Sequence, residues 1–161
     1  MTIKEYNDIV DKWADNVYRF VLSNTKDDDN AKDIVQDAFE KLWIKKDSVD
    51  YTKAKSYLFT TAYHSFIDFT RKNKRVVGLS EAEYHQPKVY SQYSDVNEVL
   101  HQAINQLPEA QKAVILLRDY EGYNYEEIAE ITNLSLAQVK VYIFRGRSHL
   151  KKVIGSIEAL V

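Results

Sequence analysis

The sequence contains few residues that interrupt a helix, and its apolar residues follow helical spacing. Its 161 residues include only four glycines and two prolines. The apolar/polar alternation typical of β-strands is scarce. Apolar residues instead recur every three or four positions, which places them on one side of an α-helix. The chain is therefore predicted to be all-α.

Three amphipathic helices are predicted in the first half of the chain. The first runs to about Leu22, the second starts after the aspartates of residues 27–29, and the third covers about residues 52–73. Aspartate suits the start of a helix because its carboxylate accepts hydrogen bonds from free backbone N–H groups. The expected inward residues are Ile3, Tyr6, Val10, Trp13, Val17 and Phe20, then Ala31, Val35, Ala38 and Leu42, then Leu58, Ala62, Phe66 and Phe69.

Helical periodicity fails after the third helix and returns near residue 95. Gly78, Pro87 and scattered polar residues indicate a flexible linker over residues 76–94. Pro108 is expected to begin a further helix, which Gly122 would end. The helix before Pro108 has the apolar residues Val96, Val99, Leu100, Ala103 and Leu107. The expected fold is two small helical bundles joined by a linker.

Charge is strongly sorted along the chain, although the formal net charge is only -2. Residues 27–40 hold six acids and one lysine, residues 71–75 hold four bases and no acid, and residues 136–152 hold five bases and no acid. Such blocks favour a protein that meets basic and acidic partners at different places. For any single block, an ordinary solvated helix face is the alternative.

The residues that enzymes and metal sites need are absent or scattered. Cysteine is missing, which excludes disulfides, thiolate metal sites and cysteine nucleophiles. The histidines (His64, His85, His101 and His149) form no pair at metal-ligand spacing, and there is no glycine-rich phosphate loop. We therefore expect a protein that is not an enzyme and has no cofactor, metal or small-molecule substrate.

The sequence also bears on where the protein acts. No apolar run is long enough to cross a bilayer, and the first residues carry acids and lack an apolar signal segment. A cytoplasmic, nucleoid-associated protein is expected.

Residues 124–147 have the signature of a helix-turn-helix. Two pairs of residues match the capping box, in which the residues at the two ends of a helix's first turn cap each other: Asn124 with Glu127, and Ser135 with Gln138. Between them, Asn133 can adopt the left-handed conformation of a tight turn. The second helix is expected to bury Leu136, Val139, Ile143, Leu150 and Ile154 and to present Ala137, Lys140, Val141, Phe144, Arg145 and Ser148. Lysine and arginine on such a face can bond guanine edges or phosphates in a major groove. A basic solvated helix without a DNA partner is the alternative.

Several segments, taken in order, resemble extracytoplasmic-function (ECF) sigma factors of the sigma-70 family. Residues 33–43 (DIVQDAFEKLW) resemble the helix that binds core RNA polymerase. Residues 57–71 (YLFTTAYHSFIDFTR) and the bases after them resemble the promoter −10 helix, and residues 107–147 resemble the −35 domain. The resemblance covers nearly the whole chain apart from the linker. It implies an alternative sigma factor that binds core polymerase, recognises a promoter, opens the −10 element and initiates transcription.

The resemblance implies a role for each part of the chain. Residues 1–75 would form sigma region 2 and residues 95–161 sigma region 4. The implied polymerase-binding residues are Asp33, Gln36, Asp37 and Glu40, which would meet the clamp coiled-coil of the β′ subunit, and the β flap is a further implied contact. The implied −10 residues are Tyr57, Thr60, Thr61, His64, Arg71, Lys72, Lys74 and Arg75, with Tyr57, Tyr63 and His64 as stacking platforms for bases. The implied −35 residues are Ala137, Lys140, Val141, Phe144, Arg145 and Ser148.

Two departures from the family pattern concern base preference. The family often has asparagine where His64 stands, and it usually has polar or basic residues at the positions of Val141 and Tyr142. The second departure favours either a weak −35 readout or apolar contact with thymine methyl groups.

Other partners and other functions stay open at this point. By resemblance, an anti-sigma protein is a further partner, and recruitment by another DNA-targeting protein, such as an RNA-guided effector, is an alternative. A stand-alone helix-turn-helix transcription regulator is the second functional interpretation, although it does not need the acidic helix of residues 33–43. A helical adaptor that touches no nucleic acid would leave both basic blocks unexplained.

Overall fold

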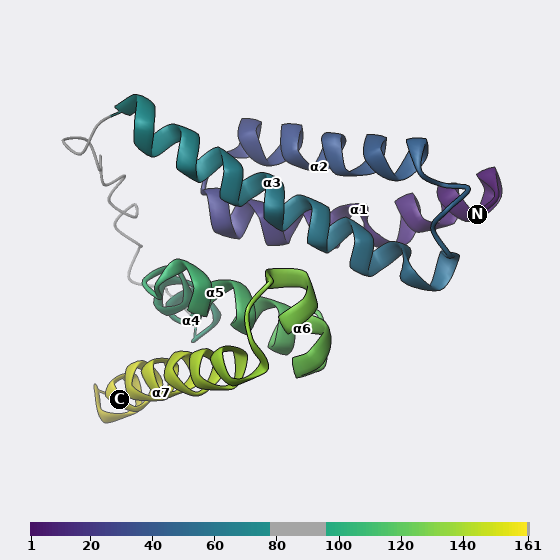
Figure 1. The fold of residues 1–161 in the computed structure, drawn as a ribbon. Coiled ribbons are helices and arrows are strands. Elements are labelled where there is room, and N and C mark those ends of the chain that lie inside the picture. The colour runs from purple at the N-terminus through teal and green to yellow at the C-terminus, as the bar shows by residue number, and fades with distance from the viewer. Residues whose placement is uncertain (78–95, 161) are drawn as a thin grey trace.

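The computed structural model describes residues 1–77 and 96–160, with side chains described for residues 1–74 and 98–155. The described residues form helices and no strand, which confirms the all-α prediction (Figure 1). The helices are α1 (Ile3–Thr25), α2 (Asp28–Ile44), α3 (Ala54–Val77), α4 (Val96–Asn105), α5 (Glu109–Ile115), α6 (Tyr125–Thr132) and α7 (Leu136–Leu160), with a 3-10 turn at Tyr51–Lys53 and a π-helical turn at Leu116–Tyr120. The predicted linker, residues 76–94, lies almost entirely outside the described residues.

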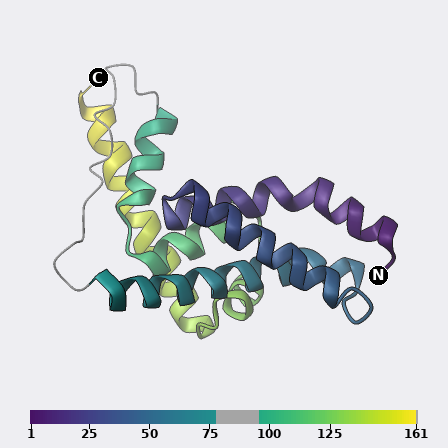
Figure 2. The same cartoon turned by 90° about the horizontal axis from the view of Figure 1, so that it is seen from above.

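The first bundle consists of α1, α2 and α3. Thr2 and Glu5 cap each other at the start of α1, and Lys26 ends that helix in the left-handed conformation. Asp27 then caps α2 by accepting from the backbone N–H of Asp29, as the aspartate run predicted. These local bonds fix the sharp turn between the two helices, so that α1 and α2 run antiparallel and both pack against α3 (Figures 1 and 2).

Eight of the fourteen expected inward residues are buried in this bundle. The other six are not, since Ile3 is exposed and the half-buried ones are Tyr6, Val10, Trp13, Val35 and Phe69. Ile3 is 59% exposed, while Ile9 and Val21, which the predicted stripe omitted, are buried. In α2, Ile34 is buried in place of Val35, which is half-buried at the edge of the core. Because α1 packs against both α2 and α3, the buried side of this helix is wider than a single stripe, and it includes Ile9 and Val21 in place of Ile3.

The second bundle consists of α4 to α7 and contains the helix-turn-helix. Asn124 and Glu127 cap α6 reciprocally, Asn133 is left-handed at φ 59°, and Ser135 and Gln138 cap α7 reciprocally. The predicted helix-turn-helix is thus confirmed in its local structure. The expected burial of Val139, Ile143 and Leu150 is also confirmed, but Leu136 is 38% exposed. Leu136 was expected inside; it instead stands in the first turn of α7, in the wall of a surface cavity beside Tyr125 and Lys140.

A close contact between α5 and α7 fixes the geometry of the second bundle. Gly146 of α7 is buried, and a Cβ atom at this position would lie 2.8 Å from Cγ1 of Ile115. Ile115 is itself 1% exposed and has little room to move. Only glycine lets the two helices approach this closely.

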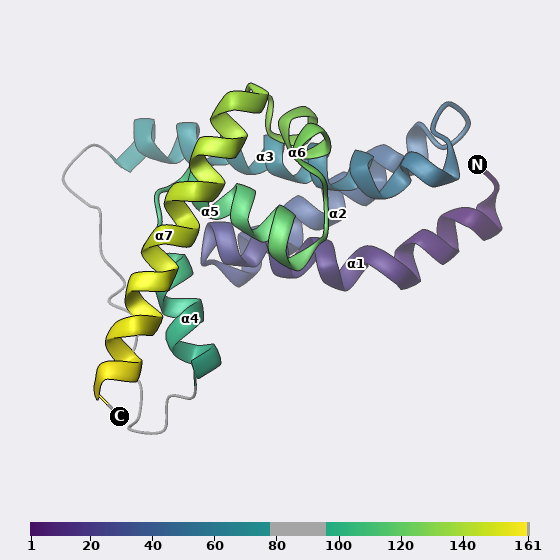
Figure 3. The same cartoon turned by 90° about the horizontal axis from the view of Figure 1, so that it is seen from below.

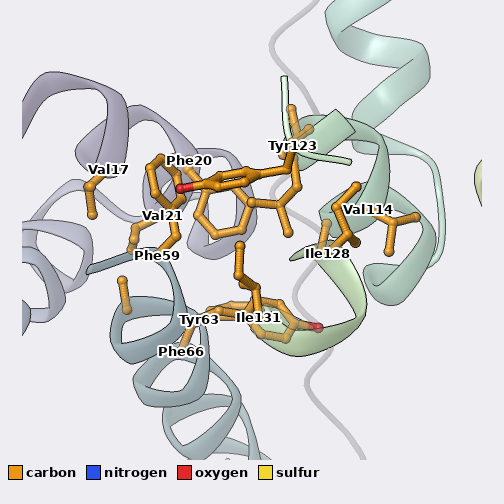
Figure 4. Close-up of a cluster of buried hydrophobic side chains, with 14 of the residues drawn as sticks. Val17, Phe20, Val21, Phe59, Tyr63, Phe66, Val114, Tyr123, Ile128 and Ile131 are labelled. Carbon is orange, nitrogen blue, oxygen red and sulfur yellow. The ribbon is translucent and has the colours of Figure 1, made fainter. Parts of the chain in front are cut away.

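The two bundles are packed against each other. α6 lies along α3, and α5 approaches α1, as Figures 2 and 3 show from opposite sides. Gly122, at φ 74°, turns the chain after the π-helical turn and directs Tyr123 toward the first bundle. There the ring of Tyr123 packs edge-on against Phe59 (Figure 4), with 5.7 Å between ring centroids.

Replacing Gly146 by alanine tests the close α5–α7 contact. The expected result is a loss of about 1 kcal/mol in the free energy of unfolding, because the overpacking cost of about 1–3 kcal/mol exceeds the gain of about 1 kcal/mol in helix propensity. Gly155→Ala is the matched control in the same helix, since a Cβ there meets nothing within 4 Å. That control is expected to raise stability. Thermal unfolding followed by circular dichroism measures the stability of both variants. An equal gain in stability for Gly146→Ala and Gly155→Ala would contradict the packing argument.

The contribution of Lys112 to the stability of the folded protein depends on pH. Its side chain is only 4% exposed, and burial, with a smaller contribution from the nearby charge of Lys26, lowers its pKa to about 8. Below pH 8 the folded protein must hold a charged, desolvated ammonium group, whereas the unfolded chain releases this proton only near pH 10.5. The folded state therefore gains stability from this group as pH rises from 8 to 10.5.

Lys112→Met is accordingly expected to raise the thermal midpoint at pH 7 and to lose this advantage by about pH 10. The control is Lys151→Met, because Lys151 is exposed and should show no such pH dependence. The test is to measure the thermal unfolding midpoints of both variants and of the unmodified protein between pH 7 and pH 10. An advantage of Lys112→Met that stays constant over this range would contradict the assignment.

Candidate polymerase and nucleic-acid interfaces

The predicted polymerase-binding residues lie together on the outer side of α2. Asp33, Gln36 and Glu40 are exposed, and Asp37 is half-buried. Asp37 forms an ion pair with Lys41 at 3.0 Å, which ties up part of its charge at the surface. We call these four predicted residues the acidic face. The face can attract a basic partner over several ångströms, because its charges are solvated and not committed to the core.

Apolar side chains continue the surface at the C-terminal end of α2. Trp43 is 41% exposed and Ile44 is 72% exposed. The Trp43 ring packs edge-on against Tyr6, with centroids 5.0 Å apart, and the Lys46 ammonium lies 4.6 Å from its centroid. These contacts hold the indole in place while leaving part of it uncovered. An anchored, partly exposed tryptophan beside acidic groups is typical of a protein-binding surface.

Part of the predicted −10 surface faces the second bundle. Tyr57 and Thr60 line a cavity of about 750 Å³ between α3 and α6, and its opposite wall includes Glu127 and Glu130. Nε2 of His64 lies 3.1 Å from the backbone oxygen of Ile131, within hydrogen-bonding distance. The structure therefore brings these predicted residues together on one side of α3, and it places an acidic helix against them.

The remaining residues of that prediction divide into four groups. Thr61 is half-buried, and Arg71, Lys72 and Lys74 are exposed near the C-terminal end of α3; the side chain of Arg75 lies outside the described residues. Tyr63, predicted as a stacking platform, is 5% exposed and packs with Phe20 and Phe66 (Figure 4). Burial, with a smaller contribution from the charge of Glu109, raises its pKa to about 12. In this arrangement Tyr63 belongs to the core and is not accessible to a base.

The predicted −35 residues form an exposed strip on α7. Ala137, Lys140, Val141 and Arg145 are exposed, Ser148 is half-buried, and Phe144 is 73% exposed. An exposed phenylalanine between two cations combines apolar and electrostatic contact on one narrow face. Arg147, from the same basic block, has a different role, because it pairs with Asp119 and joins α7 to the π-helical turn.

A set of residues that the sequence did not single out joins the two bundles. The Lys55 ammonium lies 4.7 Å from the ring centroid of Tyr123 and 4.2 Å from that of Trp13. Nζ of Lys55 donates to the backbone oxygen of Glu121, and Nδ2 of Asn16 donates to its carboxylate at 3.0 Å. Nothing in the local sequence marks these contacts, because each contact between the bundles joins positions more than sixty residues apart.

Metal sites and membrane-spanning helices are two further features that the described residues can reveal. Across residues 1–77 and 96–160, no three acidic or histidine side chains are grouped as a metal site would require. Among the helices that the structure describes, we find none with the length and hydropathy of a membrane span.

Comparison with known proteins assigns both bundles. The family model "Sigma-70 region 2" matches residues 9–76, and the model "Sigma-70, region 4" matches residues 97–150. The chain is 36% identical to the ECF RNA polymerase sigma factor SigM of Bacillus subtilis over 94% of both chains. It is 34% identical to the sigma factor SigV of the same organism, over 80% of this chain and 78% of SigV.

A solved structure extends the likeness to the arrangement of the bundles. The crystal structure of the sigma factor RpoE in complex with the anti-sigma factor NepR, from Bartonella quintana, superposes with a TM-score of 0.80. The match covers 95% of this chain and 98% of RpoE at 26% identity. These matches set aside the stand-alone regulator and the adaptor, and they agree with a transcription factor that is not an enzyme. The chain belongs to the ECF group of sigma-70 family RNA polymerase sigma factors, and it is an alternative sigma factor that directs promoter recognition and transcription initiation.

Proposed function

We propose that the acidic face of α2 docks on the coiled-coil of the polymerase β′ clamp. Asp33, Gln36, Asp37 and Glu40 would meet basic groups of the coiled-coil, and complementary charge would speed the encounter. The exposed part of Trp43, next to this face, would supply apolar contact. Support comes from the family assignment and from the accessibility of this surface.

The −10 element would be held by α3. In this proposal Tyr57 and His64 stack on or bond unstacked bases, Thr60 and Thr61 contribute hydrogen bonds, and Arg71, Lys72, Lys74 and Arg75 hold phosphates. A helix face with half-buried hydroxyl and aromatic groups suits the capture of bases that have left the duplex.

The −35 element would be read in the major groove by α7. Lys140 and Arg145 would contact guanine edges or phosphates, and Val141 and Phe144 would contact thymine methyl groups. Ala137 and Ser148 complete this face. The observation that carries the proposal is that the exposed face of α7 is both cationic and apolar, with Phe144 73% exposed in the helix that follows the helix-turn-helix turn.

The proposal includes the domain division and the remaining partners. Residues 1–75 act as region 2, residues 76–94 connect the regions, and residues 95–161 act as region 4, which also meets the β flap. An anti-sigma factor is proposed as a regulator, because the structural relative RpoE is bound by one. The site of action would be the nucleoid in the cytoplasm. Formation of an open promoter complex by core polymerase plus this protein, and not by core polymerase alone, tests the function as a whole.

Reversing charge on the acidic face tests the docking surface. Asp33→Lys with Asp37→Lys is expected to reduce binding to core polymerase at least tenfold, because two attractive contacts become repulsive. The matched control is Asp11→Lys with Asp15→Lys on α1, which makes the same change of charge at exposed positions elsewhere. Binding is measured by fluorescence anisotropy, and helicity by circular dichroism. Unchanged binding by the folded α2 variant would refute the docking surface.

Arg145→Ala tests the −35 surface. The variant is expected to bind promoter duplex more weakly and to reduce the slope of log affinity against log salt concentration by about one, since one phosphate contact or charged base contact is lost. Arg19→Ala, which removes one arginine from α1, is the control and should leave the slope unchanged. Promoter affinity is measured for both variants over a range of salt concentrations. An equal slope of log affinity against log salt concentration in the two variants would show that Arg145 does not contact DNA.

A further inference from the structure

The exposed apolar side chains of this protein gather on two helix faces of opposite charge. Trp43 and Ile44 continue the acidic face of α2, while Val141 and Phe144 lie among the cations of α7. Together with Leu136, they are five of the seven large apolar side chains that are exposed in the part of the chain whose side chains the structure describes. A face that is both apolar and charged favours a partner with apolar groups and the opposite charge.

We propose that the protein associates with copies of itself, with the acidic face of α2 in one copy packed against the exposed strip of α7 in the next. Each face carries the charge opposite to that of the other, and each offers an exposed apolar side chain. The contact depends on these two faces alone. It goes beyond the binding of polymerase and DNA that is proposed above.

The charged and apolar groups have the same spacing on the two helices. Glu40 and Ile44 are four residues apart on α2, and Lys140 and Phe144 are four residues apart on α7. Four residues make about one helical turn, or about 6 Å along the axis, so each pair lies on one side of its helix. With the two helices side by side and running in the same direction, Phe144 can pack on Ile44 while Lys140 reaches Glu40. All four side chains are exposed.

Apolar contact and charge have different effects on this association. Phe144 is 73% exposed and Ile44 is 72% exposed, so packing them together removes apolar area from water without disturbing either core. Asp33 and Arg145 add opposite charges at exposed positions of the same two faces. Ion pairs between exposed groups contribute little each, and salt screens them. The contact is therefore weak, reversible and sensitive to salt.

The two faces lie on opposite sides of the molecule. α2 forms the upper edge and α7 the lower edge in Figure 1, and Figure 3 shows α7 nearest the viewer. One chain in this arrangement cannot bring its own two faces together. Because the two surfaces of the contact differ, copies join head to tail. Each contact covers the proposed polymerase-binding surface of one copy and the proposed −35 surface of another, so association competes with both.

Sedimentation velocity of the full-length protein tests the association. The protein is compared from about 5 to about 200 µM, at about 50 and about 500 mM salt. The sedimentation coefficient is expected to rise with concentration at low salt and to lose this rise at high salt. Phe144→Ser and Ile44→Ser should each weaken association at least fivefold, because each removes one side of the apolar contact. Ile3→Ser, which changes a 59% exposed isoleucine on α1, is the matched control and should leave association unchanged.

Exchanging charge between the two faces tests which surfaces meet. Glu40→Lys sets a lysine against Lys140, and Lys140→Glu sets a glutamate against Glu40, so each variant alone is expected to lose association at low salt. An equal mixture of the two variants should associate again, because each reversed face then meets a face of opposite charge on the other variant. Asp11→Lys mixed with Lys4→Glu is the control, since both residues are exposed on α1, outside the two faces. Circular dichroism confirms that every variant is folded.

Three results would overturn the proposal. The first is a sedimentation coefficient of the unmodified protein that stays constant over the whole concentration range at low salt. The second is association that Phe144→Ser and Ile44→Ser leave unchanged. The third is a mixture of Glu40→Lys and Lys140→Glu that associates no more than either variant alone. Open-complex formation by the unmodified protein with core polymerase is measured separately, and its failure would count against the proposed function instead.

Discussion

The packing of α3 between two sets of helices determines most of this structure. On one side α3 shares a core with α1 and α2, and on the other it is covered by α6. Phe59 takes part in both environments, since its ring packs against Phe20 of α1 and against Tyr123 of the second bundle. A helix that buries two sides leaves little surface for DNA. The same packing that stabilises the whole molecule therefore limits what the proposed −10 surface can contact.

Charge sorting gives each region a different kind of partner. The acidic groups of α2 stay at the surface, and Lys140 and Arg145 of α7 are exposed on the face opposite its core. Arg147 pairs with Asp119, and this ion pair links α7 to the π-helical turn. A net charge of -2 conceals this arrangement, because electrostatic attraction acts over about 10 Å in salt and depends on local charge.

The contact between the regions has the character of a reversible interface. It combines a small apolar centre with exposed or partly buried hydrogen bonds, and interfaces of this kind between domains commonly open. RpoE in its complex with NepR has the same arrangement of two bundles.

The sequence by itself determined the secondary structure, the helix-turn-helix and the surface position of the −35 residues. These features depend on local spacing, as in the reciprocal caps of Asn124 with Glu127, and local bonds form in the same way in any tertiary context. Tertiary structure alone decided that Tyr63 is buried, that Ile9 rather than Ile3 lies in the core, and that Tyr123 and Glu121 join the regions. Each of these outcomes depends on which helix packs against which face, and residues far apart in the chain settle that choice together through the apolar area they bury.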